Sequence, residues 1–441
     1  MAAPAVIHYQ ARPVLNPGIQ RFLFATGIEC SYPTIETPNG PLRRDQMAEC
    51  RHYERWRDDL RLVREMGIRY LRYGPPYYRM HLGPDHYDWG WTDEVLPEMR
   101  RLGIVPILDL CHFGVPDWAG NFQNEDWPAR FAEFACAFAR RYPWVRFYTP
   151  VNEMYITAEF SGYYGWWNER LQSHQGFVTA LKNLARANVL AMRAIRKVRR
   201  DALFILCESS EHTHPSHPDL VDEAELFNER RFLTLDLTCG RHVNAGMHAY
   251  LRDNGMTESE YLFFFAHDLR EHCIVGHDYY VTNEHLLVDE ERREFAGDIL
   301  GYYAVAWSYH DRYRLPVMHT ETNRNEPDAL AWLWKTWANI RQLRHDGVPL
   351  VGMTWYSLTD QVDWDTALRE KNDRVNPLGL FDLDRNIRPV GRAYKKLIEQ
   401  WGHLPLLPGG PLTLCLPGAE EQDPPPAEPG SSIASSQRST A

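Results

Sequence analysis

The stretch RFYTPVNEMYI, Arg146 to Ile156, decides how we interpret the fold. Five of its first six residues are aromatic, β-branched, proline or threonine, a composition that suits a buried strand. The run then ends in an amide and a carboxylate, Asn152 and Glu153. This order predicts a buried strand whose end opens onto a site that needs polar groups.

Seven further apolar runs alternate with longer helical patterns along the chain. They are RFLFAT (21–26), IRYLRY (68–73), IVPILDL (104–110), LFILC (203–207), CIVGHDYY (273–280), LPVMHT (315–320) and LVGMTWY (350–356). Helices are predicted at YERWRDDLRLVREMG (53–67), WPARFAEFACAFARRY (127–142) and AWLWKTWANIRQLRHDG (331–347). Eight strand and helix units in one continuous region predict an α/β fold, a single (β/α)8 TIM barrel over residues 21–402.

The composition changes beyond this region. Residues 403–441 are rich in Pro, Gly, Ser and Glu, so we expect a low-complexity, disordered C-terminal tail. Residues 1–20 form a short N-terminal extension with neither a charged start nor the apolar run of a signal peptide.

Charge and cysteine usage exclude several classes of partner. With 48 Lys and Arg against 59 Asp and Glu, the chain carries a net charge of −11, which disfavours nucleic acid and anionic lipid. No run is long enough to span a membrane. Eight cysteines without C-x-x-C spacing indicate reduced thiols and a cytoplasmic location. We interpret HTHPSHP (212–218) as a solvated loop, and expect neither a metal nor a cofactor.

Polar side chains follow most of the predicted strands, where the active site of a barrel lies. They are Arg72, His112, Asn152, Glu153, Asp278, Tyr279, Glu321, Trp355, Tyr356, Asp360, Asp363 and Trp364. Any one of them alone is more often a helix cap or a structural ion pair. Two carboxylates within such a ring are typical of glycosidic bond cleavage, in which one acid protonates the departing oxygen and one nucleophile attacks the anomeric carbon.

The two glutamates are assigned different roles. We expect Glu153 to be the acid/base and Glu321 to be the nucleophile, kept ionised by Arg72. A separation of about 5–5.5 Å would make the enzyme retaining. The flat faces of Trp355, Trp364, Phe113 and Trp118 suit stacking on a sugar ring, and Asp363, His112 and Asn152 suit its hydroxyls.

These motifs resemble family 1 glycoside hydrolases, the β-glucosidase-like barrels, over most of residues 21–400. The similar segments are TPVNEMYI, HTETN, GMTWYSLTDQVDW, LDLCHFGVPDW, YLRYGPPYYRM and GLFDLDRNIRPVGRAYKKLI. The resemblance implies that Arg72 contacts the nucleophile, that His112 and Asn152 hold the sugar next to the cleaved bond, that Tyr279 orients Glu321, and that Asp363 and Trp364 contact the far edge of that sugar.

The chain also departs from the family pattern. Met154 replaces the usual Pro after the acid, Thr322-Asn323 the usual Asn-Gly after the nucleophile, and Asp363 the usual Glu, and Asp278 stands where Asn is typical. Near the N-terminus the family normally has a sugar-binding Gln, whereas this chain offers Glu29, Tyr32 or Thr34 in that neighbourhood and no Gln. The departures concern the sugar that fits rather than the carboxylate pair.

The sequence therefore predicts a retaining exo-acting β-glycosidase whose partner is a small-molecule β-glycoside or oligosaccharide. Two alternatives stay open at this point. One is a non-hydrolytic carbohydrate-binding barrel, suggested by the departures around both glutamates. The other is a related barrel hydrolase acting on longer β-glycans, which an open groove would favour.

Overall fold

Eight parallel strands close into a barrel, which confirms the predicted fold class. The computed structural model describes residues 21–267, 269–290 and 292–407. The barrel strands, in the order in which they follow along the chain, are β1 (Leu23–Ile28), β4 (Tyr70–Tyr73), β7 (Val105–Asp109), β8 (Phe147–Thr149), β9 (Leu203–Ser209), β11 (Cys273–Asp278), β14 (Val317–Glu321) and β15 (Leu350–Trp355). Each of the eight apolar runs overlaps one of them, and β1 pairs with β15 to close the cylinder.

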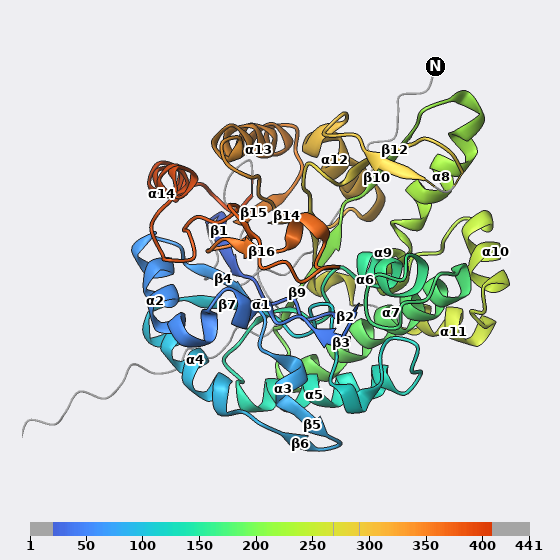
Figure 1. Cartoon of the computed structure of the whole chain (residues 1–441), viewed down its shortest axis with the longest axis horizontal. Helices are drawn as coiled ribbons and strands as arrows, with labels where there is room; N and C mark the ends of the chain where they lie inside the picture. The colour runs from blue at the N-terminus through green and yellow to red at the C-terminus, as the bar shows by residue number, and fades with distance from the viewer. Residues whose placement is uncertain (1–20, 268, 291, 408–441) are drawn as a thin grey trace, which may run out of the picture.

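A ring of helices surrounds the strands (Figure 1). Its main members are α2 (His52–Glu65), α4 (Gly90–Arg101), α5 (Trp127–Arg141), α7 (His174–Val198), α12 (Gly301–Tyr313), α13 (Ala329–His345) and α14 (Pro389–Trp401). The three helices predicted from the sequence correspond to α2, α5 and α13. Gly67 and Gly347 follow two of them with φ of 76° and 91°, a left-handed conformation that glycine adopts without a Cβ clash.

The side chains of the strands alternate between the barrel interior and the helices. On β9, Leu203, Ile205 and Cys207 belong to the interior cluster, whereas Phe204 and Leu206 pack against the helical layer. The same alternation of side chains places Tyr70 and Arg72 of β4, and Ile107 and Asp109 of β7, on the interior side of the barrel. The interior therefore changes from apolar to charged toward the carboxyl ends of the strands.

The opposite end of the barrel is closed by the chain after α14. Leu406 is 5% exposed and belongs to the interior cluster, and the Phe22 N–H donates to the Leu404 carbonyl at 2.8 Å. Arg344 donates to the carbonyls of Pro405 (2.6 Å) and Leu406 (2.8 Å). Residues 403–407, which the composition placed in the tail, thus pack on the barrel. Residues 1–20 and 408–441 lie outside the described residues.

The histidine-rich segment after β9 is a strand rather than a solvated loop. β10 (His212–Pro215) pairs with β12 (Glu284–Leu287), which pairs with β13 (Arg293–Phe295). His214 lies 2.7 Å from a carboxylate oxygen of Glu284, and His217 caps a short 3-10 helix. The three histidines therefore face different neighbours.

Two further findings concern the whole chain. Within the described ranges, no helix is both long and apolar enough to cross a bilayer. Short helices α8 (Val221–Arg230), α9 (Leu233–Thr238), α10 (Ala245–Asp253) and α11 (Glu258–Phe263) follow β10 and enlarge one side of the helical ring (Figure 1).

A buried histidine on β14 makes stability depend on pH. His319 is fully buried against the Tyr302 ring, with centroids 3.9 Å apart, and neither ring nitrogen has a hydrogen-bond partner among the described residues. Burial, followed by the nearby His277, lowers the pKa of His319 well below its usual value. The neutral His319 ring therefore contributes fully to the free energy of unfolding above about pH 6.5, the pKa of histidine in the unfolded chain. This contribution is lost as the pH falls.

We expect His319→Leu to reduce this acid sensitivity. Between pH 7 and pH 5.5, the variant should lose about 1 kcal/mol less unfolding free energy than the wild type, because it has no ring to protonate on unfolding. Urea denaturation at both pH values measures this difference. The exposed His345→Gln should behave as the wild type; an identical pH dependence of His319→Leu and wild type would contradict the prediction.

Candidate active site

Arg72 organises the carboxyl end of the barrel. Its side chain is 1% exposed and donates to Glu321 Oε1, to Asn152 Oδ1 and, at 2.9 Å, to Asp109 Oδ2. Asp109 also accepts from His112 Nδ1 at 2.7 Å. One guanidinium thus connects the ends of three strands, and breaking such a buried network by removing one partner is costly.

His112 is held in a fixed orientation within this network. Burial opposes protonation, but Cys30 and Asp109 beside the ring raise the pKa of His112 well above its usual value. Its Nε2 lies 3.2 Å from the Asn152 amide nitrogen. The ring also lines the cavity described below, so its fixed orientation is presented to a ligand.

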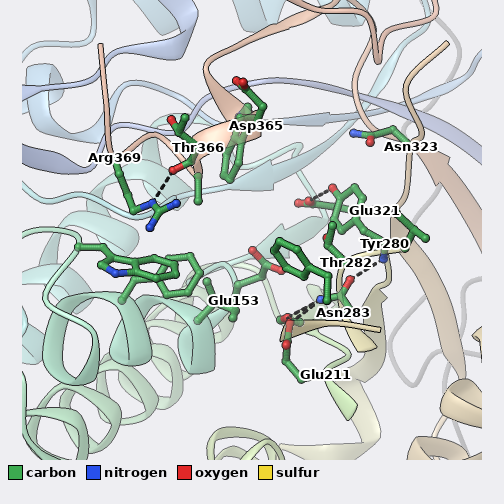
Figure 2. A pocket seen from close by; sticks show the side chains of 18 of the residues that line it. Glu153, Glu211, Tyr280, Thr282, Asn283, Glu321, Asn323, Asp365, Thr366 and Arg369 are labelled. Atoms are coloured by element: carbon green, nitrogen blue, oxygen red, sulfur yellow. Dashed lines mark hydrogen bonds between the residues drawn. The ribbon is translucent and has the colours of Figure 1, made fainter. Parts of the chain in front are cut away.

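Glu153 lies just past β8, where the chain turns into α6 (Met154–Ala158). Its backbone is left-handed (φ 37°), and its N–H donates to the Cys207 carbonyl at 3.0 Å. The Thr157 N–H (2.9 Å) and hydroxyl (2.8 Å) both bond the Glu153 carbonyl. The backbone is therefore fixed by neighbours on both sides, while the side chain stays directed at the cavity (Figure 2).

Glu321, the last residue of β14, is fixed by two donors. Arg72 donates to Oε1, and the Tyr280 hydroxyl donates to Oε2 at 2.6 Å (Figure 2). One carboxylate oxygen each of Glu153, Asp278 and Glu321 lie within 4.8 Å of one another. The two glutamates thus approach each other at the same end of the barrel.

The protonation of Glu153 follows from its surroundings. Burial, and then the charges of Asp278 and Glu321, raise the pKa of Glu153 well above its usual range. A carboxyl group in such a position keeps its proton near neutral pH and can serve as an acid.

The carboxylate groups could also suggest a metal site. Two clusters of possible ligands occur among the described residues, Cys30 with Asp109 and His112, and Glu153 with Asp278 and Glu321. Arg72 bonds Asp109 in the first cluster and Glu321 in the second. The positive charge of this guanidinium lies beside both clusters and would repel a further cation there.

A cavity of about 880 Å³ opens above this network. Glu153, Glu321, His112 and Trp364 line it, as predicted for site residues, and so does Phe113. In Figure 2, Glu153 lies between a wall carrying Thr366 and Arg369 and a wall carrying Tyr280, Asn283 and Glu321. The volume falls within the range of small-molecule sites.

Comparison with known proteins decides the family. The sequence profile described as glycosyl hydrolase family 1 matches residues 36–328. The chain belongs to this family. It is therefore a glycoside hydrolase, and its β-glucosidase-like relatives support hydrolysis of β-glycosides.

Individual relatives of this glycosyl hydrolase are distant. A 6-phospho-beta-glucosidase of Clostridium longisporum is 21% identical over 407 residues, covering 79% of this chain and 84% of that protein. A bifunctional beta-D-glucosidase/beta-D-fucosidase of Bifidobacterium breve is 25% identical over 375 residues, covering 80% and 77%. Among solved structures, a Thermotoga maritima beta-glucosidase in complex with noeuromycin has a TM-score of 0.73 at 16% identity, covering 88% of this chain and 99% of that one. At that identity the structural likeness supports the fold alone.

Five of the predicted substrate-binding residues do not line the cavity of this glycosyl hydrolase. Arg72, Asn152, Tyr279, Trp355 and Asp363 are all buried behind its walls. Arg72 and Asn152 nevertheless belong to the network that holds Glu321 and His112. Trp118 is also absent from the lining, because its Nε1 donates to the His81 carbonyl at 2.6 Å.

The prediction that Tyr279 orients Glu321 is wrong by one residue. Asp278 points into the barrel, so Tyr279 points outward, where it donates to Glu284 at 2.7 Å and stacks on Trp332. Tyr280 then points back inward and bonds Glu321. The alternation of side chains along the strand explains the error.

The same alternation corrects the end of β15. Trp355 is fully buried and donates to the Leu378 carbonyl at 2.9 Å. Tyr356 lines the cavity instead, with its ring nearly parallel to that of His112 (6°, centroids 6.2 Å apart). The aromatic surface beside the glutamates is therefore supplied by a tyrosine.

Asp363 stabilises a loop and does not face the cavity. Its carboxylate accepts from Arg44 (2.9 Å) and from the N–H groups of Asn372 (2.9 Å), Asp373 (3.1 Å) and Arg374 (2.8 Å). Burial opposes ionisation, but these three N–H groups and Arg44 lower the pKa of Asp363. The chain folds back on itself between residues 363 and 374, a contact that spacing along the sequence does not reveal.

We expect Asp363→Asn to reduce stability more than binding. An amide would face Arg44 with one acceptor fewer, at a cost of about 3 kcal/mol of unfolding free energy. Urea denaturation measures this loss, and KM for an aryl β-glycoside should change by less than about threefold. A large rise in KM at unchanged stability would instead restore the predicted sugar contact.

The sequence did not predict that Glu29 and Gln361 lie together in the cavity. Glu29 is 2% exposed, and its carboxylate accepts from the Ser31 hydroxyl at 2.5 Å and from Gln361 Nε2 at 2.8 Å. Both Glu29 and Gln361 line the cavity. The position of Glu29, in the neighbourhood where the family has a Gln, was the signal available in the sequence.

Proposed function

We propose that this glycosyl hydrolase is a retaining β-glycosidase that acts on small β-glycosides by double displacement. The observation that carries the proposal is the approach of Glu153 and Glu321 to within 4.8 Å across one cavity. Retaining enzymes place their carboxyl groups about 5–5.5 Å apart, whereas inverting enzymes need about 6.5–9.5 Å to admit a water molecule.

In the first step, the Glu321 carboxylate attacks the anomeric carbon while Glu153 gives its proton to the departing glycosidic oxygen. The bond from carbon to the leaving oxygen breaks as the ester to Glu321 forms. In the second step, Glu153 takes a proton from water, and the resulting hydroxide displaces Glu321 from the sugar. The enzyme returns to its starting protonation state.

The neighbours of each glutamate suit these roles. Arg72 donates to one oxygen of Glu321 and Tyr280 to the other, so the nucleophile is held in a fixed position. Glu153 has no ion-pair partner among the residues described, and its raised pKa favours the acid form. These different environments distinguish Glu153, the proton donor, from Glu321, the nucleophile.

We infer that the sugar next to the cleaved bond contacts His112, Glu29, Gln361, Tyr356 and Trp364. All five line the cavity, and they combine hydrogen-bonding groups with aromatic faces, as sugar sites do. The carboxyl group of Glu29 suits the hydroxyls of a neutral sugar and offers no positive charge to a phosphate group. The cavity of about 880 Å³ suits a mono- or disaccharide glycoside rather than a long glycan.

A panel of p-nitrophenyl β-glycosides tests the substrate class. We expect hydrolysis of at least one neutral β-glycoside, with the 6-phosphoglucoside a poorer substrate. Proton NMR of the first product should show the β-anomer, since two displacements restore the configuration. An α-anomer as first product would contradict the retaining mechanism, and saccharide binding without turnover would favour a non-hydrolytic barrel.

A cytoplasmic location belongs to the same proposal. Cys30, Cys50, Cys111, Cys136 and Cys207 are free thiols, which suits a reducing compartment. Cell fractionation with a specific antibody tests it, and recovery in the extracellular fraction would contradict it.

A further inference from the structure

A third carboxyl group lies beside the two glutamates. Asp278 ends β11, is fully buried, and places one oxygen within 4.8 Å of an oxygen of Glu153 and of Glu321. It does not line the cavity, so it does not meet a substrate directly. Any influence on the reaction must act through its neighbours.

Asp278 is unusually poor in hydrogen bonds for a buried carboxyl group. Neither oxygen has a hydrogen bond of ordinary geometry among the described residues, although the Thr320 hydroxyl is a close neighbour. The nearest cation is Arg72, whose Nη1 lies 3.9 Å from Oδ1 but donates to Glu321. A buried carboxyl group without dedicated donors is costly, which calls for an explanation other than stability.

Titratable groups face Asp278 from several sides of the barrel. They are Arg72 on β4, Glu153 after β8, Cys207 and Glu208 on β9, Tyr280 after β11, Tyr302 on α12 and Glu321 on β14. Arg72 is the only cation among them within 4.0 Å of Asp278 in the described part of the chain.

Arg72 also sets the order in which the carboxyl groups lose their protons. It bonds Glu321, lies at ion-pair distance from Asp278, and has no ion pair with Glu153 in the described chain. Because Arg72 stabilises a negative charge on Asp278 and pairs with no oxygen of Glu153 in the described chain, Asp278 ionises before Glu153. When Asp278 ionises, its charge lies within 4.8 Å of an oxygen of the still protonated Glu153. At such a distance a charge in a protein interior shifts a neighbour's proton affinity by more than about tenfold.

We propose that Asp278 is a positioning residue for the proton donor, whose negative charge keeps the proton on Glu153 at alkaline pH. Asn, which is typical of the family at this position, would supply no such charge. The inference rests on the proposed roles of Glu153 and Glu321. Its consequence is an enzyme whose activity extends further toward alkaline pH than the two glutamates alone would allow.

The test compares wild type, Asp278→Asn and Asp278→Ser on two substrates. Phenyl β-glycoside needs a proton from Glu153 because phenol is a poor leaving group, whereas the 2,4-dinitrophenyl glycoside needs none. On the phenyl glycoside, we expect the upper pKa of kcat/KM to fall by at least about one pH unit in both variants. At the wild-type upper pKa, the wild type keeps half of its maximal kcat/KM and each variant about a tenth of its own, a difference of about fivefold. The lower pKa of the kcat/KM profile should be the same in the wild type and both variants.

On the dinitrophenyl glycoside, the alkaline limbs of wild type and variants should coincide. Asp346→Asn, which makes the same chemical change at an exposed position on the far end of α13, should match the wild type on both substrates. Thermal unfolding of each variant shows whether it is folded under the assay conditions.

Three results would overturn the proposal. They are an unmoved alkaline limb in folded variants, an equal change on both substrates, or a wild-type upper pKa within the ordinary carboxyl range near 4. The last measurement needs no variant and decides the matter if neither variant folds. If the wild type hydrolyses neither glycoside, that result would instead contradict the proposed function itself.

Discussion

Glu321→Ala is expected to lower kcat/KM for an aryl β-glycoside by at least about 10⁴-fold, the order at which removal of a covalent nucleophile acts. Without the carboxylate, no electron pair is available to attack the anomeric carbon on the face opposite the leaving group. The loss should appear in kcat more than in KM, because Glu321 forms its new bond only during the reaction.

Added azide should restore part of the activity of this variant. The truncated side chain leaves room beside Arg72 and Tyr280, which donate to Glu321 in the wild type and would now face the small anion. Attack from that side yields the α-glycosyl azide from a β-glycoside, which NMR identifies. The control is Glu94→Ala, whose carboxylate is 63% exposed and paired with an exposed Arg57, so activity should not change. Full activity of Glu321→Ala would remove the nucleophile from the mechanism.

Glu153→Ala should lower kcat/KM by about 10²–10⁴-fold on a phenyl glycoside, the usual contribution of general acid catalysis. The effect should shrink to a few-fold on the 2,4-dinitrophenyl glycoside, since that leaving group departs without a proton. The alkaline limb of the pH profile should also disappear, because the group with the raised pKa is gone. Steady-state kinetics across pH with both substrates measures these outcomes.

The second half of the reaction gives an independent readout for Glu153→Ala. Without a base to activate water, the glycosyl ester on Glu321 should accumulate and produce a burst of dinitrophenol. Azide should then attack the ester from the side that Glu153 occupied and yield the β-glycosyl azide, the opposite anomer to that from Glu321→Ala. An equal rate loss on both substrates, or the same azide anomer from both variants, would contradict the assigned roles.

The barrel was predictable because its evidence is local. Each strand is an apolar run of a few residues, and runs such as LFILC and LVGMTWY remain apolar on both faces because the interior and the helices both bury them. The glutamates followed from the rule that chemistry lies at the carboxyl ends of the strands. Glu153 and Glu321 do face one cavity.

The errors came from one-residue differences in register at the strand ends and from a loop whose contacts join residues 9 to 11 positions apart. Tyr279 and Trp355 were preferred over Tyr280 and Tyr356 because the last inward position of each strand was not fixed. At the junction of β11 and β14 the register shifts beside Asp278, a bulge that a sequence pattern does not show. Asp363 was assigned to a sugar because its loop, which returns to it ten residues later, was not visible.

The closure of the barrel by residues 404–407 separates the C-terminal end of the described residues from the mouth of the cavity that Glu153 and Glu321 line. A surface or a fusion partner joined after Leu407 would thus attach at the pole opposite the one where substrate enters. Immobilised in that orientation, the enzyme would keep its entrance directed at the flowing solution. The same linkage placed before Leu404 would remove the residues that close this end of the barrel.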